Sequence, residues 1–146
     1  MRFPPARLRR LVALGSLSLV AGCQQSSSTA SSGAGAPANA AADRGAVLYA
    51  QNCVPCHRDN GEGLPKVFPS LSGSPAVIGD PVELAAWVLS QKRPASIPAG
   101  RYPTQMLLFG WMSDADAAAL LTYIRSHFGN SAPPVDTATI AKSREK

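Results

Sequence analysis

The chain has 146 residues, of which 45% are hydrophobic and 16% charged, and its formal net charge is +5. This length suits one globular domain. Most of the excess positive charge lies outside the middle of the chain, because residues 43–130 contain seven basic and seven acidic residues. A nucleic-acid-binding domain would need a basic face of its own, so the charge distribution argues against that class of partner.

The first 22 residues have the pattern of an export signal. Four arginines lie within the first ten positions, and an apolar run over residues 11–20 follows them. A basic start, about ten apolar residues and small residues at the exit are typical of a signal peptide. The run is too short for a mature transmembrane helix, which needs roughly 20 apolar residues. We therefore expect residues 1–22 to be removed on export; a buried N-terminal core helix is the alternative.

The segment Val20-Ala21-Gly22-Cys23 resembles the bacterial lipoprotein signature, in which the cysteine carries the lipid. Residues 24–42 are almost entirely small or polar, a composition that cannot bury enough apolar area to fold. We expect lipidation at Cys23, a disordered tether over 23–42 and a periplasm-facing location at the bacterial membrane. Gln24 favours the outer membrane over the inner one. In the alternative, Cys23 merely lies near the end of an ordinary signal peptide.

A helix is predicted over residues 44–52, with Asp43 as its N-cap. It leads into a Cys-x-x-Cys-His motif formed by Cys53, Cys56 and His57.

The motif is compatible with several kinds of site, each of which needs different further residues elsewhere in the chain. Zinc requires four ligands, but the chain has only one further histidine, His127, and Cys23 as its only other cysteine. A thioredoxin-like dithiol would need strand patterning that the sequence lacks, and a plain disulfide leaves His57 unexplained. The spacing is the attachment signature of c-type haem, because two thiols on one turn reach one edge of the macrocycle while the imidazole binds iron. We expect one covalently bound haem c, with a disulfide as the alternative.

Two further helices follow a loop. Residues 58–79 are rich in Gly, Pro and Ser and predict a loop with at most one short turn. Asp80 as N-cap and Pro81 at the first helical position predict a helix to about Gln91, and Pro94 prevents its continuation.

The last predicted helix begins after Ser113, which with Asp116 resembles a capping box. Apolar residues recur at helical intervals up to Phe128, and Gly129 closes the helix. We expect the tail over 131–146, with two prolines and scattered charges, to be disordered.

From Asp43 to Asn130 the chain resembles the class I cytochromes c, small all-α electron carriers with three main helices around one haem. The Cys-x-x-Cys-His motif carries the resemblance. Gly45 and Tyr49 occupy the places where the family has a small and an aromatic residue on the first helix, facing the last. The resemblance implies a cytochrome c domain over 43–130, electron transfer as its task and no enzymatic activity of its own.

The resemblance also assigns roles to the loop after the motif. Residues 69–73, Pro-Ser-Leu-Ser-Gly, are similar to the family's stretch in which a proline carbonyl accepts a hydrogen bond from the proximal imidazole. It implies that Pro69 orients His57 and that Leu71 lines the haem. A plain Pro-Ser turn is the alternative.

Met106 aligns with the methionine that is the family's sixth iron ligand, although Leu107 replaces the proline that usually follows it. The resemblance therefore implies His57 and Met106 as the two metal ligands. Met112 is expected to be the apolar residue before the last helix, and His127 an exposed polar residue.

These ligands lead to three functional hypotheses. Two protein ligands on the iron leave no position for a substrate, which favours a membrane-tethered electron carrier between respiratory partners such as a dehydrogenase and a terminal oxidase. The alternative is the cytochrome subunit of a periplasmic dehydrogenase complex, because residues 110–130 are similar to cytochromes associated with sugar and alcohol dehydrogenases. A haem enzyme or a gas- or peroxide-binding protein with a labile Met106 is the third. We expect no nucleic-acid partner and no small-molecule substrate.

Overall fold

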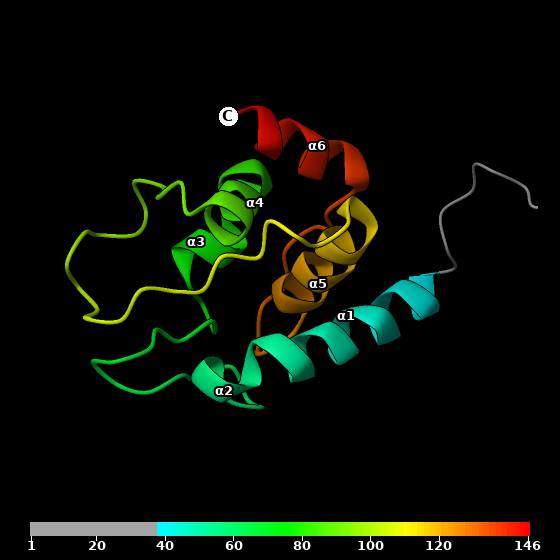
Figure 1. Ribbon diagram of the computed structural model, residues 1–146. Coiled ribbons are helices and arrows are strands. Elements are labelled where there is room, and N and C mark those ends of the chain that lie inside the picture. Colours follow the sequence, from blue (N-terminus) through cyan, green and yellow to red (C-terminus); the bar gives the residue numbers. More distant parts are fainter. Residues whose placement is uncertain (1–37) are drawn as a thin grey trace, which may run out of the picture. The chain divides into compact units, whose positions relative to one another are not determined.

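The computed structural model describes residues 38–146, which form six helices joined by loops (Figure 1). The helices are α1 (Ala38–Asn52), α2 (Val54–His57), α3 (Pro75–Ile78), α4 (Pro81–Ser90), α5 (Asp114–Ser126) and α6 (Thr137–Glu145). Over these residues there is no strand, only an isolated bridge between Leu64 and Phe68. The predicted all-α class is therefore confirmed. The predicted signal peptide, the predicted lipidation site Cys23 and the predicted tether up to residue 37 lie outside the described residues.

Helix α4 begins and ends where its local sequence predicts. The Asp80 carboxylate accepts hydrogen bonds from the backbone N–H groups of Val82 (2.7 Å) and Glu83 (3.3 Å), as an N-cap should. The helix ends at Ser90, and its C-cap Gln91 adopts a left-handed conformation with φ of 55°.

Helix α5 has the predicted start and an earlier end. The Ser113 hydroxyl accepts a hydrogen bond from the Asp116 N–H at 3.1 Å, which is half of the predicted capping box. The helix stops at Ser126, because Phe128 (φ 60°) and Gly129 (φ 78°) are both in the left-handed region.

The start of helix α1 differs from the prediction. The helix begins at Ala38, so Asp43 lies inside it and is not its N-cap. Residues 38–42, which we assigned to the tether, belong to the helix. Alanine has the highest intrinsic helix propensity, and the Ala40-Ala41-Ala42 run extends the helix towards the N-terminus.

The crossing of α1 and α5 matches the expectation for Gly45 and Tyr49. A Cβ atom on Gly45 would overlap the Ala119 carbonyl oxygen and lie 2.7 Å from the Tyr123 Cβ, so only glycine permits this approach. The Tyr49 ring lies 5.6 Å from that of Tyr123 and 4.9 Å from that of Phe128. The aromatic contacts of Tyr49 and the close backbone approach at Gly45 together define how the two helices pack.

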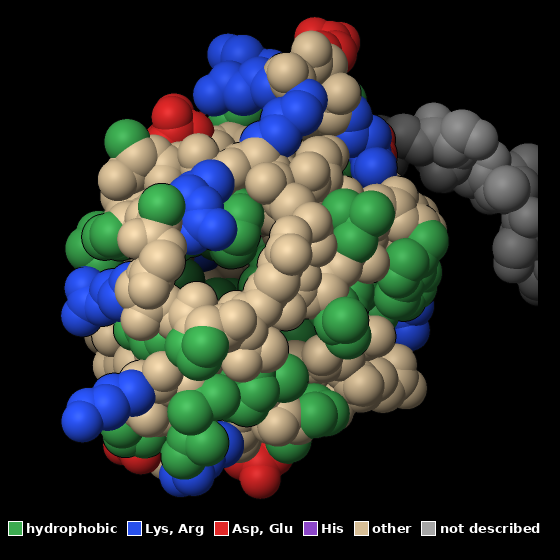
Figure 2. All heavy atoms as spheres, turned by 60° about the vertical axis from the view of Figure 1, so that its left-hand side comes forward, with side chains coloured by type: hydrophobic (Ala, Val, Ile, Leu, Met, Phe, Trp, Pro, Cys, Tyr) green, Lys and Arg blue, Asp and Glu red, His purple; other side chains and the backbone are tan. Residues whose placement is uncertain are grey.

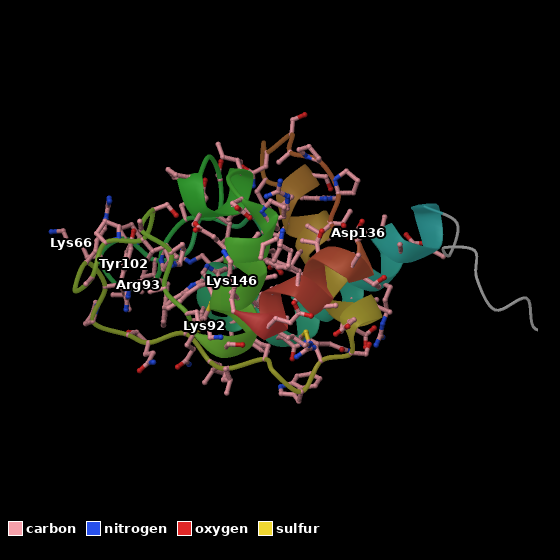
Figure 3. All side chains as sticks on the ribbon, turned by 90° about the horizontal axis from the view of Figure 1, so that it is seen from above. Lys66, Lys92, Arg93, Tyr102, Asp136 and Lys146 are labelled. Atoms are coloured by element: carbon pink, nitrogen blue, oxygen red, sulfur yellow. The ribbon has the colours of Figure 1, made fainter. Side chains whose placement is uncertain are left out.

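The C-terminal tail is ordered, and the prediction of disorder over 131–146 was wrong. Helix α6 is capped by Asp136, which accepts a hydrogen bond from the Thr139 N–H at 2.7 Å. It packs against α4 and α5, and Figure 3 shows it lying across α4. Ile140 and Ser143 are 0% exposed. A single large apolar residue in a polar helix gives no visible helical period, so the sequence pattern did not reveal this packing.

A buried arginine ties two other segments to α5. The Arg125 guanidinium donates to the carbonyl groups of Val77 (2.6 Å) and Gly79 (2.9 Å) at the end of α3, and to that of Pro133 (2.9 Å). Its side chain is 2% exposed, and burial lowers its pKa. Because every partner is a neutral carbonyl oxygen, the charge is stabilised by hydrogen bonds without a counter-ion in contact.

Among residues 38–146, no helix is both long enough and apolar enough to cross a bilayer.

Candidate haem site

The Cys-x-x-Cys-His motif forms one tight turn that continues from α1. The Cys53 N–H donates to the Tyr49 carbonyl at 2.8 Å, and the His57 N–H donates to the Cys53 carbonyl at 2.8 Å. The Tyr49 hydroxyl donates to the Arg58 carbonyl at 2.6 Å and so fixes the residue after the turn. Because side chains three residues apart lie on the same side of a helical turn, the turn presents the thiols of Cys53 and Cys56 together.

Both cysteines of the motif are free thiols, with Cys53 buried and Cys56 half-buried. Burial raises the pKa of the Cys53 thiol to about 12, so this sulfur is protonated at neutral pH. A redox dithiol needs a thiolate as its attacking group, which this environment opposes. The raised pKa therefore gives no support to the thioredoxin-like alternative, and the two sulfurs are not joined in a disulfide.

The imidazole of His57 is oriented by the Pro69 carbonyl. Nδ1 of His57 lies 3.0 Å from the Pro69 carbonyl oxygen, and the side chain is 8% exposed. A carbonyl oxygen can only accept, so Nδ1 carries the proton and Nε2 keeps its lone pair. Burial lowers the pKa of His57, although the bond to Pro69 acts in the opposite direction. A neutral imidazole with a free Nε2 is the form that binds a metal.

A glycine and an asparagine that sequence reasoning did not single out hold the Pro69 loop in place. Gly63 has φ of 67°, and a Cβ on it would lie 2.5 Å from the carbonyl oxygens of Phe68 and Pro69. Its N–H donates to the His57 carbonyl at 3.0 Å. The close approach of two backbones at this point requires glycine. The Gly-x-Gly pattern at residues 61–63 was the only sequence signal that could have indicated this close approach.

Asn130 joins the same loop to the end of α5. Its side-chain amide donates to the carbonyls of Leu71 (3.1 Å) and Ile124 (3.0 Å) and accepts from the Gly73 N–H (2.8 Å). The residue is 7% exposed. No local pattern indicates this role, since the loop residues that it binds lie 57 and 59 positions away. Leu71 itself is half-buried against the core.

Met106 lies in the long loop between α4 and α5, half-buried and packed against the core. The Gln91 side chain at the end of α4 donates to the Met106 carbonyl at 2.8 Å. Met112 is 2% exposed in the core, immediately before the Ser113 N-cap. His127 is exposed, and its ring stacks on Tyr123 with centroids 3.8 Å apart. The burial of Met112 and the exposure of His127 agree with the roles expected for them. Met106 remains the predicted ligand.

The surroundings of the motif also suit a large apolar ring. The loops over residues 58–74 and 91–105 extend to the left of Figure 1, and Figure 2, which brings that side forward, shows a hollow with hydrophobic side chains inside it. Leu107 and Leu108 in the second loop are 69% and 54% exposed, whereas Phe109 is 8% exposed. Apolar side chains left open to this extent are typical of a binding surface.

Other metal sites find no support in the part of the chain that the structure describes. Over residues 38–146 there is no cluster of three or more His, Cys, Asp or Glu side chains placed to hold a metal ion. A structural zinc site needs four such ligands. Two free thiols and one oriented imidazole fit haem c, which Cys53 and Cys56 would attach and whose iron His57 would bind.

Fold and site together define an all-α protein that carries a covalently bound haem, and the comparisons with known proteins agree. The sequence profile of the cytochrome c family matches residues 42–128. The chain is 34% identical over 105 residues to the cytochrome c subunit of the quinone alcohol dehydrogenase of Gluconobacter oxydans (strain 621H), covering 68% of this chain and 22% of that protein. The chain belongs to the cytochrome c family.

Two other relatives differ in how much of their length is matched. The gluconate 2-dehydrogenase cytochrome c subunit of Pantoea cypripedii is 30% identical over 105 residues, which is 70% of this chain and 24% of that protein. Cytochrome c-552 of Thermus thermophilus is 30% identical over 92 residues, which is 60% of this chain and 70% of that protein. The chain thus spans less than a quarter of the dehydrogenase subunits and most of a small cytochrome.

Proposed function

We propose that this protein is an exported, membrane-tethered carrier of single electrons whose haem iron is bound by His57 and Met106. Haem c supplies a one-electron redox centre when it is bound. The protein contributes the two thiols that hold it, the imidazole that Pro69 orients, and a loop that brings Met106 against the core. If His57 and Met106 both bind the iron, no position would remain for a substrate, which favours electron transfer over catalysis.

The observation that carries this proposal is the hydrogen bond from His57 Nδ1 to the Pro69 carbonyl. It fixes the tautomer and the ring orientation, and it increases the electron donation of Nε2 to a metal.

Covalent attachment is tested by extraction. The protein, purified from a host that attaches haem, should keep its colour on the polypeptide after denaturation and extraction with acidified organic solvent. A Cys53→Ala, Cys56→Ala double variant that still takes up haem should lose the colour under the same treatment, because only non-covalent contacts would hold the haem. Release of the haem from the unmodified chain would contradict the proposal.

A second candidate function is that of a subunit in a dehydrogenase complex. It is favoured by the names of the relatives from Gluconobacter oxydans and Pantoea cypripedii, which are cytochrome c subunits of dehydrogenases. Small, transient interfaces are usual for free electron carriers, whereas a subunit has a permanent partner. Purification from native membranes distinguishes the two: a fixed ratio to a dehydrogenase supports the subunit, and a lone monomer supports the carrier, whose partners include a dehydrogenase or a terminal oxidase.

The tether is part of the proposal and lies outside the described residues. Lipidation at Cys23 would keep the domain close to membrane partners and raise their effective concentration. A Cys23→Ala variant should move from the membrane fraction to the soluble periplasmic fraction. An unchanged distribution, or a mature N-terminus without lipid in mass spectrometry, would contradict this part.

A ligand-binding or enzymatic role would require Met106 to leave the iron readily. Exposure of the reduced protein to carbon monoxide at neutral pH tests this point. An unchanged spectrum supports the carrier, and rapid binding would favour the enzymatic hypothesis.

A further inference from the structure

We infer that the C-terminal helix α6 is a brace for the loop that carries the iron's sixth ligand, and that Arg144 is the positioning residue of this brace. The inference rests on the proposed ligation by Met106. Helix α6 lies entirely outside residues 42–128, the part of the chain that the family profile matches.

Arg144 contacts the end of the loop over residues 91–113 and the first residue of α5 at three points. Its Nη2 donates to the Met112 carbonyl at 2.6 Å, its Nη1 to the Gly110 carbonyl at 3.1 Å, and its Nε to the Asp114 carboxylate at 2.8 Å. A planar guanidinium with several fixed donors is suited to holding such a set together. The partners lie 30 to 34 positions earlier in the chain, so these bonds join distant segments.

Arg144 is itself held on a firmly packed element. The residue before it, Ser143, is fully buried, and Ile140 on the same helix is part of the core. The start of the helix is attached as well, because the Val135 N–H donates to the Thr122 hydroxyl on α5 at 2.9 Å. A side chain that positions others must have a fixed base of its own, and α6 provides one.

The same loop is attached to α4 on its other side. Gln91 holds the Met106 carbonyl, and the Phe109 N–H donates to the Val88 carbonyl at 3.3 Å. Leu107 and Leu108 between these points are largely exposed. Few buried side chains therefore fix the loop, and hydrogen bonds from its two neighbouring helices take on much of that task.

A second ion pair in the molecule provides a matched control. The Arg44 Nε donates to the Asp116 carboxylate at 2.7 Å, so each of the two pairs joins an arginine to the first turn of α5. Both are partly exposed, and their general contribution to stability should be similar and small. Only Arg144 also binds the carbonyls of the loop, so only its loss should free Met106.

The experiment compares Arg144→Gln with Arg44→Gln in the haem-loaded protein. Imidazole competes with Met106 for ferric iron, and we expect Arg144→Gln to bind it roughly three- to tenfold more tightly than the unmodified protein, because charge-assisted hydrogen bonds of the loop are lost. Arg44→Gln should change the affinity less than twofold. Arg144→Lys, which keeps the charge but not the fork of donors, should lie between the two.

Hydrogen–deuterium exchange over residues 104–113 gives a readout that does not depend on the ligand. Uptake should increase in Arg144→Gln and not in Arg44→Gln. Equal behaviour of the two variants in exchange would overturn the brace. Met106→Ala serves as the reference for ligation: if it keeps the sulfur-to-iron absorption band of the ferric form, Met106 is not the ligand, and the exchange result alone decides whether α6 braces the loop.

Discussion

At the scale of single residues, a backbone carbonyl twelve positions along the chain decides which nitrogen of His57 is free. Because the Pro69 oxygen can only accept, the proton stays on Nδ1 and Nε2 is left for iron. Gly63 makes that approach possible, and Asn130 holds the following residues. The site therefore depends on backbone atoms as much as on the side chains of the motif.

The two methionines before α5 should respond differently to truncation. Met106→Ala is expected to abolish the long-wavelength sulfur-to-iron band of the ferric form with a modest loss of stability. Met112→Ala is expected to keep the band and to lower the free energy of unfolding by about 2–5 kcal/mol, since the side chain is 2% exposed in the core. Visible absorption and denaturant unfolding of the same samples measure both effects. Loss of the band in Met112→Ala alone would reverse the assignment.

At the scale of elements, the helix starts predicted at Asp80 and Ser113 are confirmed, because a capping side chain decides each of them. Helix crossings depend on contacts instead. Gly45 is unfavourable inside a helix by its intrinsic propensity, yet the approach of the Ala119 backbone demands it. Packing therefore outweighs propensity at this crossing.

Gly45→Ala should destabilise the protein although alanine is the better helix former. The added Cβ would overlap the Ala119 carbonyl, and forcing the helices apart should lower the free energy of unfolding by about 1–3 kcal/mol. Val47→Ala, at a position that is 46% exposed on the same helix, should have little effect or stabilise slightly. Chemical denaturation of the haem-loaded variants measures both changes. A gain in stability for Gly45→Ala would show that α1 and α5 do not approach so closely.

The cap of α6 predicts a pH dependence. Hydrogen bonds from Thr139 lower the pKa of Asp136. A depressed pKa means that the carboxylate's contribution is fully present above the ordinary aspartate pKa of about 4 and is lost as the pH falls through the lower folded value. The difference in stability between the unmodified protein and Asp136→Ala should thus be constant near neutral pH and shrink in acid.

Asp136→Asn is the control for that experiment, because asparagine also caps a helix but does not titrate in this range. Its difference from Asp136→Ala should persist in acid. A cap effect that is unchanged below pH 4 in the unmodified protein would contradict a role for the charged carboxylate.

At the scale of the whole molecule, α6 extends the core beyond the part that the cytochrome c family profile matches. Val135 and Ile140 join the same hydrophobic cluster as residues of α4 and α5. The helix thereby links the last residues of the chain to the loop that contains Met106. A segment that looked like a tail is part of the structure around the proposed site.

Ile140→Ala tests whether this part of the core stabilises the protein. The side chain is 0% exposed, so its truncation should lower the free energy of unfolding by about 2–5 kcal/mol. Lys142→Ala, at an exposed position of the same helix, should change it by less than about 0.5 kcal/mol. Denaturant unfolding of both variants provides the comparison. Equal, negligible effects would mean that α6 does not stay docked in solution.

The sequence alone was sufficient for those features that depend on neighbouring residues. The Cys-x-x-Cys-His motif indicates haem because three side chains on one turn have few other uses in that order. Asp80 and Ser113 place the starts of two helices because a cap acts on the N–H groups two or three positions ahead. The all-α class was implied by the family resemblance that this motif carries.

Only the tertiary structure revealed α6, the hydrogen bonds of Asn130 and those of Arg144. The bonds from Asn130 to the Pro69 loop and the bonds of Arg144 join segments thirty or more positions apart, and such a contact leaves no periodic trace in either segment. Thr-Ala-Thr-Ile-Ala-Lys-Ser-Arg-Glu reads as polar because a helix docked by one isoleucine and a buried serine needs little apolar surface. The role of the α6 residues is therefore determined by their tertiary contacts and is not visible in their composition.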